Sequence, residues 1–275
     1  MKLCILCMSC NQDIFKYQEM VAMNTWINYA KINNIDIYIY TSGSENKIID
    51  HKIYCNIPDD VNHTYEKTIE VLKQINIDKY DYIIRTNLTT YINIDALIKY
   101  CYFLKNNNYN IANGCLCIKD NIVHYRGNSL IFDKNISKYL LNNIYQNKNN
   151  IHDDAIFPLI FKDIEYLKIH SAPFRYYCKE GIFINHPQKI DIINKDNCNG
   201  VVFISFRITY NINEKYKEYN SRYIELGRCY EIDSIYNKLN NELLKNNLNI
   251  IFNCDTNNFI KCDSIIQKNK LLTFI

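Results

Sequence analysis

The stretch KYDYIIRTNLTTYIN, residues 79–93, governs how the rest of the chain is interpreted. It begins as an apolar strand at residues 82–84 and changes abruptly to the polar run Arg85-Thr86-Asn87 before apolar residues resume. At the carboxyl edge of an open α/β sheet, polar residues that end a strand lie where ligands bind. The local pattern alone favours a strand followed by an ordinary turn, and only the surrounding chain changes that interpretation.

The composition is that of a globular protein with a real core. A length of 275 residues suits one large domain, or one domain with a small appendage. A hydrophobic content of 48% excludes a disordered chain, and a net charge of +3 is too small to indicate a nucleic-acid partner. Asn, Ile, Lys and Tyr are abundant beside 6 Gly and 4 Pro, which indicates an AT-rich genome and makes single Asn and Lys residues poor markers of function.

The 12 cysteines are expected to be free thiols. Residues 1–10 carry one Lys and a short apolar run without a small-residue cleavage site, so no signal peptide is expected. No stretch approaches the roughly 18 apolar residues of a membrane span, and a reducing, cytoplasmic compartment is therefore predicted. Cys4, Cys7 and Cys10 resemble a metal triplet, but side chains alternate along a strand, which favours a buried first strand instead.

Apolar strands alternate with amphipathic helices over most of the chain. Strands are expected at residues 3–8, 35–40, 48–57, 82–84, 111–118, 121–125, 129–132, 166–170 and 201–208, and helices at residues 15–30, 65–75, 94–104, 136–145 and from 152 onward. This alternation predicts an α/β fold with a mixed, mainly parallel sheet flanked by helices. One domain is expected at residues 1–210, and a small C-terminal α/β module at residues 222–275.

Four short segments follow one another in an informative order. They are Asn24-Thr25-Trp26 on the first helix, Tyr65-Glu66-Lys67-Thr68 opening the next long helix, Arg126-Gly127 before a strand and a helix, and Asp153-Asp154-Ala155 opening a late helix. Together they resemble the galactosyltransferase-like glycosyltransferases of the β-1,3-galactosyltransferase type, which have a GT-A fold. The resemblance covers residues 1–175. Such proteins also occur in bacteria and in large DNA viruses, and a viral source would place the chain in the host cytoplasm.

The resemblance implies transfer of a hexose from a nucleotide sugar, in particular a UDP-sugar, to a hydroxyl group of a glycan or protein, with inversion. A base must take the proton of the attacking hydroxyl. Family position assigns this role to Asp154, with Asp153 beside it, whereas the alternative is that both residues cap the helix that follows. Arg126, Gly127 and His152 are assigned to the acceptor side.

The donor side departs from the family pattern. The family has an Asp-x-Asp segment that binds a divalent metal and the diphosphate, and this chain has Asn87-Leu88-Thr89 instead. Mg²⁺ and Mn²⁺ rely on carboxylate oxygens, so a metal ion would lack its expected ligands here. The sequence therefore predicts either metal-independent transfer or a relative that has lost catalysis.

Without a metal ion, the charge of a diphosphate must be met by cations and backbone amides. Lys67 and Arg85 are the nearest candidates, with Arg126 and Arg175 as later ones, and a solvated cation is the alternative for each. Asn87 and Thr89 are expected to contact the donor. Ser9 and Cys10 follow the first strand, where a sheet of this type often touches a nucleotide.

Two other functions fit the sequence. One is a non-catalytic protein that binds a glycan or a nucleotide sugar with the same fold. The other is a nucleotidyltransferase, against which the absence of a Gly-rich phosphate loop argues. Neither a nucleic-acid partner nor a membrane span is expected, and the oligomeric state stays open.

Overall fold

The computed structural model describes residues 1–11, 13–114, 116–119, 122–125, 127–146, 153–161, 164, 167–172, 174–177 and 202–206. The end of the predicted domain and the predicted C-terminal module, residues 207–275, lie outside the described residues.

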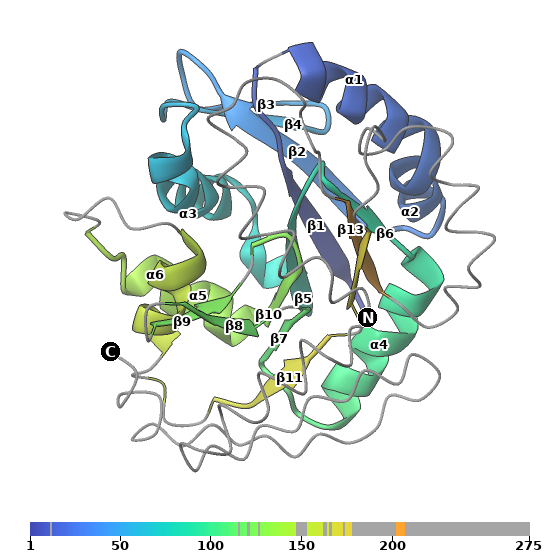
Figure 1. The fold of residues 1–275 in the computed structure, drawn as a ribbon, viewed down its shortest axis with the longest axis vertical. Helices are drawn as coiled ribbons and strands as arrows, with labels where there is room; N and C mark the ends of the chain where they lie inside the picture. The colour runs from blue at the N-terminus through green and yellow to red at the C-terminus, as the bar shows by residue number, and fades with distance from the viewer. Residues whose placement is uncertain are drawn as a thin grey trace.

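An eight-stranded sheet forms the centre of the described chain, with the strand order β11-β7-β10-β5-β1-β2-β4-β3 (Figure 1). Its middle is parallel and consists of β5 (Tyr82–Asn87), β1 (Leu3–Met8), β2 (Asp36–Ser42) and β4 (Lys52–Cys55). Antiparallel pairs flank it: β10 (Leu130–Asp133) lies between β5 and β7 (Ile111–Asn113), and β3 (Lys47–Ile49) pairs with β4 at one edge. At the other edge β11 (Ile169–Ser171) runs parallel to β7.

Helices cover both faces of this sheet (Figure 1). One face carries α1 (Asp13–Ala22), the π-helix Met23–Ile27, α2 (Asn28–Ile32) and α4 (Ile94–Asn106), and the other carries α3 (Thr64–Gln74), α5 (Lys134–Asn142) and α6 (Asp153–Phe161). Short 3-10 turns at Val61–His63 and Ile77–Lys79 precede α3 and β5. The predicted mixed, mainly parallel α/β architecture is thereby confirmed.

Two small sheets accompany the large one. β6 (Thr90–Ile92) pairs antiparallel with β13 (Phe203–Phe206), which pairs parallel with β12 (Phe174–Tyr177). β8 (Leu116–Lys119) and β9 (Ile122–Tyr125) form an antiparallel pair. The single strand expected at residues 111–118 is therefore divided, because residues 111–113 form β7 of the large sheet and β8 begins at Leu116. The strand β12 was not expected from the sequence.

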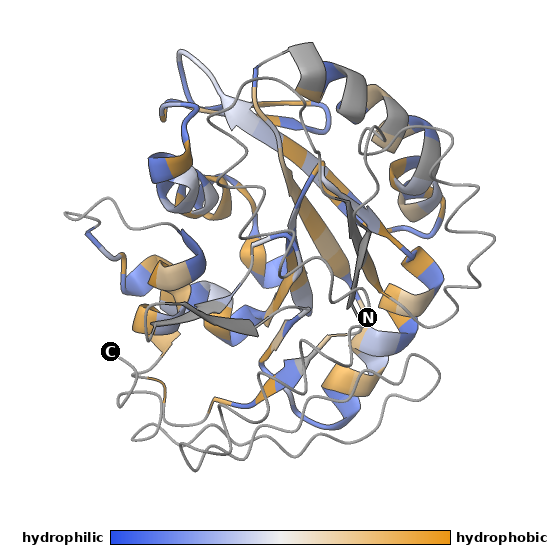
Figure 2. Cartoon of the chain, viewed as in Figure 1, coloured by the Kyte–Doolittle hydropathy of each residue, from blue (hydrophilic) through white to orange (hydrophobic). Residues whose placement is uncertain are grey.

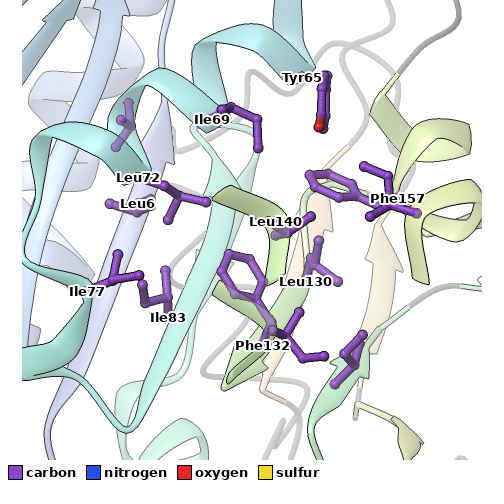
Figure 3. Close-up of a cluster of buried hydrophobic side chains, with 14 of the residues drawn as sticks. Leu6, Tyr65, Ile69, Leu72, Ile77, Ile83, Leu130, Phe132, Leu140 and Phe157 are labelled. Carbon is purple, nitrogen blue, oxygen red and sulfur yellow. The ribbon is translucent and has the colours of Figure 1, made fainter. Parts of the chain in front are cut away.

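The uninterrupted apolar runs of the central strands supply two cores at once. Because side chains alternate along a strand, Cys4, Leu6 and Ile83 face α3, α5 and α6, while Ile5 and Ile84 face α4 and the first helices. Figure 3 shows Leu6 and Ile83 meeting Leu72, Phe132 and Leu140 on the first of these faces. In Figure 2 the central strands are accordingly mostly apolar, while polar residues gather on the outer surfaces of the helices.

Three further expectations about single elements differ from the structure. The helix expected at residues 15–30 begins at Asp13 and is interrupted by the π-helix Met23–Ile27, whose wider turn lets the adjacent Trp26 and Ile27 both be buried. Residues 48–57 were expected to hold one short strand, which is β4, but β3 forms a hairpin with it because Asp50 adopts a left-handed conformation (φ 54°) and the chain reverses there. The strand expected to stop at residue 84 continues to Asn87.

The described cysteines Cys4, Cys7, Cys10, Cys55 and Cys101 are free thiols. Cys4 and Cys7 belong to opposite cores, as strand alternation predicted, and burial raises the pKa of both thiols well above the ordinary value. Among the described helices there is no segment with the length and apolar character needed to cross a bilayer.

The central position of β1 leads to a stability prediction. Leu6→Ala removes a side chain that is 0% exposed, whereas Ile49→Ala on the edge strand β3 removes one that is 49% exposed. We expect Leu6→Ala to cost about 2–5 kcal/mol of unfolding free energy and Ile49→Ala at most about 0.5 kcal/mol. Urea unfolding midpoints measure both, and equal losses would contradict the assignment of β1 to the centre of the sheet.

Candidate functional site

The strand order reverses at β1, and this creates the candidate site. β1 pairs with β2 on one side and with β5 on the other, and all three strands run in the same direction. Residues Met8 and Asn87 are paired at the carboxyl ends of β1 and β5. In an open α/β sheet the crevice outside such a reversal is where ligands bind. The predicted donor residues Ser9, Cys10, Asn87 and Thr89 belong to the segments that leave this edge.

Arg85 lies inside β5 rather than in a turn after it, which corrects the expected element boundary. Its guanidinium is 2% exposed and donates a 2.5 Å hydrogen bond from Nη2 to Oδ2 of Asp153 at the start of α6. The same nitrogen lies 3.4 Å from Sδ of Met8. Burial by itself opposes the charged form, but Asp153, followed by Tyr40 and Asp154, raises the pKa of Arg85 above its ordinary value. The charge is therefore retained and paired with Asp153.

Gly127 lies directly against that guanidinium. A Cβ atom at this position would overlap Nη1 of Arg85 and lie 2.5 Å from its Cζ. The backbone N–H of Gly127 donates a 2.8 Å hydrogen bond to Oδ1 of Asp154. Beside it, the Oγ1 hydroxyl of Thr86 donates to the carbonyl of Asn128 at 2.9 Å, which holds this turn to β5. The structure thus brings together four predicted site residues that are up to 69 positions apart in the sequence.

The two neighbouring aspartates have different surroundings. Asp153 is 6% exposed; its Oδ2 accepts from Arg85 and its Oδ1 accepts from the backbone N–H of Asp154 at 3.0 Å. Asp154 is only partly buried. Both residues occupy the first turn of α6, where a carboxylate also interacts favourably with the helix dipole. Asp154 is therefore the carboxylate of this pair that retains access to solvent.

A second group of contacts surrounds Lys67 on α3. Its side chain is buried and donates to Oδ1 of Asp59, while Oδ2 of Asp59 accepts from the backbone N–H of Asn11 at 2.7 Å and lies 3.4 Å from Oγ1 of Thr41. Burial tends to raise the pKa of Asp59, but the bonds from Lys67, Asn11 and Cys10 lower it below its ordinary value. Lys67, Asp59, Asn11 and Thr41 are called the Lys67 cluster below.

Tyr40 connects the two groups. Its hydroxyl lies 3.0 Å from Oγ1 of Thr68, the neighbour of Lys67, and it interacts electrostatically with Arg85. The backbone of Tyr40 also accepts a 2.8 Å hydrogen bond from the N–H of Ser9. Burial raises the pKa of Tyr40, so its hydroxyl stays protonated. Both groups therefore belong to one continuous polar layer at the carboxyl edge of the sheet.

The Asn87-Leu88-Thr89 segment forms a closed turn. Oδ1 of Asn87 accepts from the backbone N–H of Thr89 at 3.1 Å and from the Thr89 hydroxyl, while Leu88 is fully buried. Its one side-chain oxygen is therefore occupied within the turn, and the described residues contain no group of three or more His, Cys, Asp or Glu side chains that could hold a metal ion. This donor set does not fit Mg²⁺ or Mn²⁺.

Not every predicted site residue can be placed. Arg126 and His152 lie outside the described residues, as does the side chain of Arg175. Among the residues at the site, Asp59 and Tyr40 were not singled out from the sequence. A usable signal existed for both, since Tyr40 ends an expected strand and Asp59 follows another, so that each falls at the carboxyl edge.

No family model matches the chain, and no curated protein matches it. Among solved structures, the crystal structure of S. aureus TarS 1-349 is similar at 12% sequence identity with a TM-score of 0.41, over 62% of this chain and 58% of that one. The match thus spans less than two thirds of the TarS structure, and a likeness of this size says nothing about activity or substrate.

The ion pair of the Lys67 cluster leads to a pH prediction. The pKa of Asp59 is lower in the folded state than the unfolded value of about 3.9, so the pair contributes stability above that pH and loses it as the pH falls through the folded pKa. We expect the gap in Tm between wild type and Asp59→Asn to be largest near neutral pH and to narrow below about pH 4. Lys67→Gln should show the same narrowing, and a gap independent of pH in both variants would contradict the prediction.

Proposed function

We propose that this chain is a glycosyltransferase that transfers a hexose from a nucleotide sugar to a hydroxyl acceptor. The observation that carries the proposal is the convergence of Arg85, Gly127, Asp153 and Asp154 at the carboxyl edge beside the strand reversal. Gly127, Asp153 and Asp154 belong to segments that the sequence resemblance names, and Arg85 precedes the Asn87-Leu88-Thr89 segment, where the chain departs from the family pattern. The choice of a UDP-sugar, the galactosyltransferase-type relationship and the viral source rest on that resemblance alone.

Asp154 is the proposed base. It is partly exposed, whereas the carboxylate of Asp153 is engaged by Arg85. In the proposed step, Asp154 takes the proton of the acceptor hydroxyl while the hydroxyl oxygen bonds to the anomeric carbon. The bond from that carbon to the diphosphate oxygen breaks, and the nucleoside diphosphate leaves with the electron pair. Attack opposite the leaving group inverts the configuration, as the resemblance implies.

The donor is proposed to lie along the segments that leave β1 and β5. Cys10, Asn87 and Thr89 are partly exposed there, whereas the side chain of Ser9 is buried. Lys67 and Arg85 are buried, and each forms an ion pair, with Asp59 and with Asp153 respectively. Their positive charges are therefore already compensated by carboxylates. Neutralisation of the diphosphate would then depend on backbone amides or on cations such as Arg126, and transfer without a divalent metal stays a prediction.

The compensated charges also favour a second function. A protein of this fold that binds a glycan or a nucleotide sugar without transferring it needs neither a metal site nor a cation for the leaving group. The paired state of Lys67 and Arg85 and the closed Asn87 turn agree with it. A measurement of turnover separates the two functions. Both proteins would bind the ligand, but only a glycosyltransferase would form a glycosylated product.

Asp154→Asn tests the proposed base. The amide oxygen can still accept from Gly127, while the group can no longer take a proton, so we expect transfer to fall about 10²–10⁴-fold with donor binding retained. Product formation from a UDP-hexose, measured by mass spectrometry, gives the rate. Asp95→Asn is the matched control, since Asp95 is an exposed acid in the first turn of α4. Equal activity in wild type and Asp154→Asn would remove Asp154 from the mechanism.

Metal dependence is tested separately by thermal unfolding with nucleotide sugars. A ligand that binds only the folded state raises its stability, by about 2.7 kcal/mol at 100 times Kd. We expect the same increase in Tm for a UDP-hexose with Mn²⁺ and with EDTA, because the described residues provide no carboxylate set for the ion. An increase that requires Mn²⁺ would show that the ligands lie elsewhere in the chain.

A further inference from the structure

Four residues at the candidate site form a closed ring of contacts. Arg85 donates to Asp153, Asp153 accepts the backbone N–H of Asp154, and Asp154 accepts the backbone N–H of Gly127. The ring closes where the Cα of Gly127 lies against the guanidinium of Arg85. It joins β5, the turn before β10 and the first turn of α6, which are three separate pieces of the chain.

The positive charge of Arg85 is buried, so its stability depends on the groups around it. Its side chain is 2% exposed, and Met8 and Tyr40 approach it from β1 and β2. A charged group in such a place is stable only with a partner, and Asp153 is the carboxylate beside it. Because the guanidinium is buried, direct contact with a donor diphosphate would require the residues that cover Arg85 to move.

Gly127 is matched to this arrangement. A side chain at position 127 would occupy the space that the guanidinium fills, so residue 127 must lack a Cβ atom for as long as Arg85 is paired with Asp153. Because the N–H of Gly127 holds the carboxylate of Asp154, a displacement of this turn is passed directly to Asp154. A displacement of about 1 Å can reduce a catalysed rate on the order of 100-fold.

We propose that Arg85 is a positioning residue that, through Asp153 and the close approach of Gly127, fixes the Asp154 carboxylate at the carboxyl edge of the sheet. This inference rests on the proposed function for its catalytic meaning. It assigns Arg85 to the support of the base rather than to the binding of the donor. It also assigns Asp153 to that support, since both of its oxygens are engaged within the ring.

The first test is a mutational cycle that measures thermal stability and does not require the protein to transfer sugar. Gly127→Ala is made in wild type and in the paired variant Arg85→Gln, Asp153→Asn, which replaces both charges by amides and whose shorter residue 85 leaves room for a Cβ atom. We expect Gly127→Ala to lower Tm by several degrees in wild type and by a small fraction of that in the paired variant. Equal losses in the two backgrounds would overturn the proposed contact.

The second test measures the local stability of the backbone around Asp154 and the affinity of the protein for UDP. In the paired variant, amide hydrogen exchange should quicken at Gly127 and in the first turn of α6, while the affinity for UDP, measured by calorimetry, stays at the wild-type value. Leu97→Ala on α4 is the control for lost stability alone, because Leu97 is fully buried on the opposite face of the sheet. Weaker UDP binding in the paired variant but not in Leu97→Ala would show that Arg85 is a donor ligand and would overturn the inference.

Kinetics complete the test. If the chain transfers sugar, we expect the paired variant to lose kcat on the order of 100-fold with an unchanged KM for the donor, while Leu97→Ala keeps both. An unchanged kcat would overturn the inference while leaving the proposed function intact. If wild type transfers no sugar but the Gly127 coupling and the quickened exchange are observed, the proposed function fails and the positioning of Asp154 by Arg85 stands.

Discussion

The buried ion pair between Arg85 and Asp153 is the interaction on which the candidate site depends. A guanidinium that is 2% exposed cannot be solvated by water, so a carboxylate must lie beside it and the surrounding backbone must leave it room. These two requirements place α6 against β5 and require a glycine at position 127. The location of Asp154 follows from them, because it is the next residue of α6 and accepts the N–H of Gly127.

The sheet explains why this happens at one edge. With β2 on one side of β1 and β5 on the other, the chain leaves the strands in diverging directions and the last residues of β1 and β5 are left side by side. Alternation along each strand places the long apolar residues in two cores, so a polar residue such as Arg85 can be accommodated only near the strand end. The Lys67 cluster occupies the same layer one strand further along, next to β2 and β4.

Both buried cations of this layer already have a carboxylate partner, and this shapes the chemistry open to the site. An arrangement of compensated charges holds side chains in place without attracting anions strongly. It is compatible with the proposed role of Asp154, in which a partly exposed carboxylate accepts a proton. The closed turn at Asn87 agrees with this view, since its amide oxygen is satisfied internally.

The sequence by itself determined the class of fold. The apolar run of β1 and the amphipathic patterns of α3 and α4 are local features of the sequence, so the positions of these elements were predicted well. The π-helix at Met23–Ile27 and the chain reversal at Asp50 were not predicted, because they depend on how side chains pack and on one backbone conformation.

The sequence also supplied the separate residues of the candidate site, including Arg85, Gly127 and the two aspartates. Only the tertiary structure decided which of them are paired: Asp59 for Lys67, Asp153 for Arg85, and a backbone N–H for Asp154. The physical reason is that ion pairs and close backbone approaches join residues that are far apart in the chain. The separation of two residues in the sequence does not determine the distance between them in the folded protein.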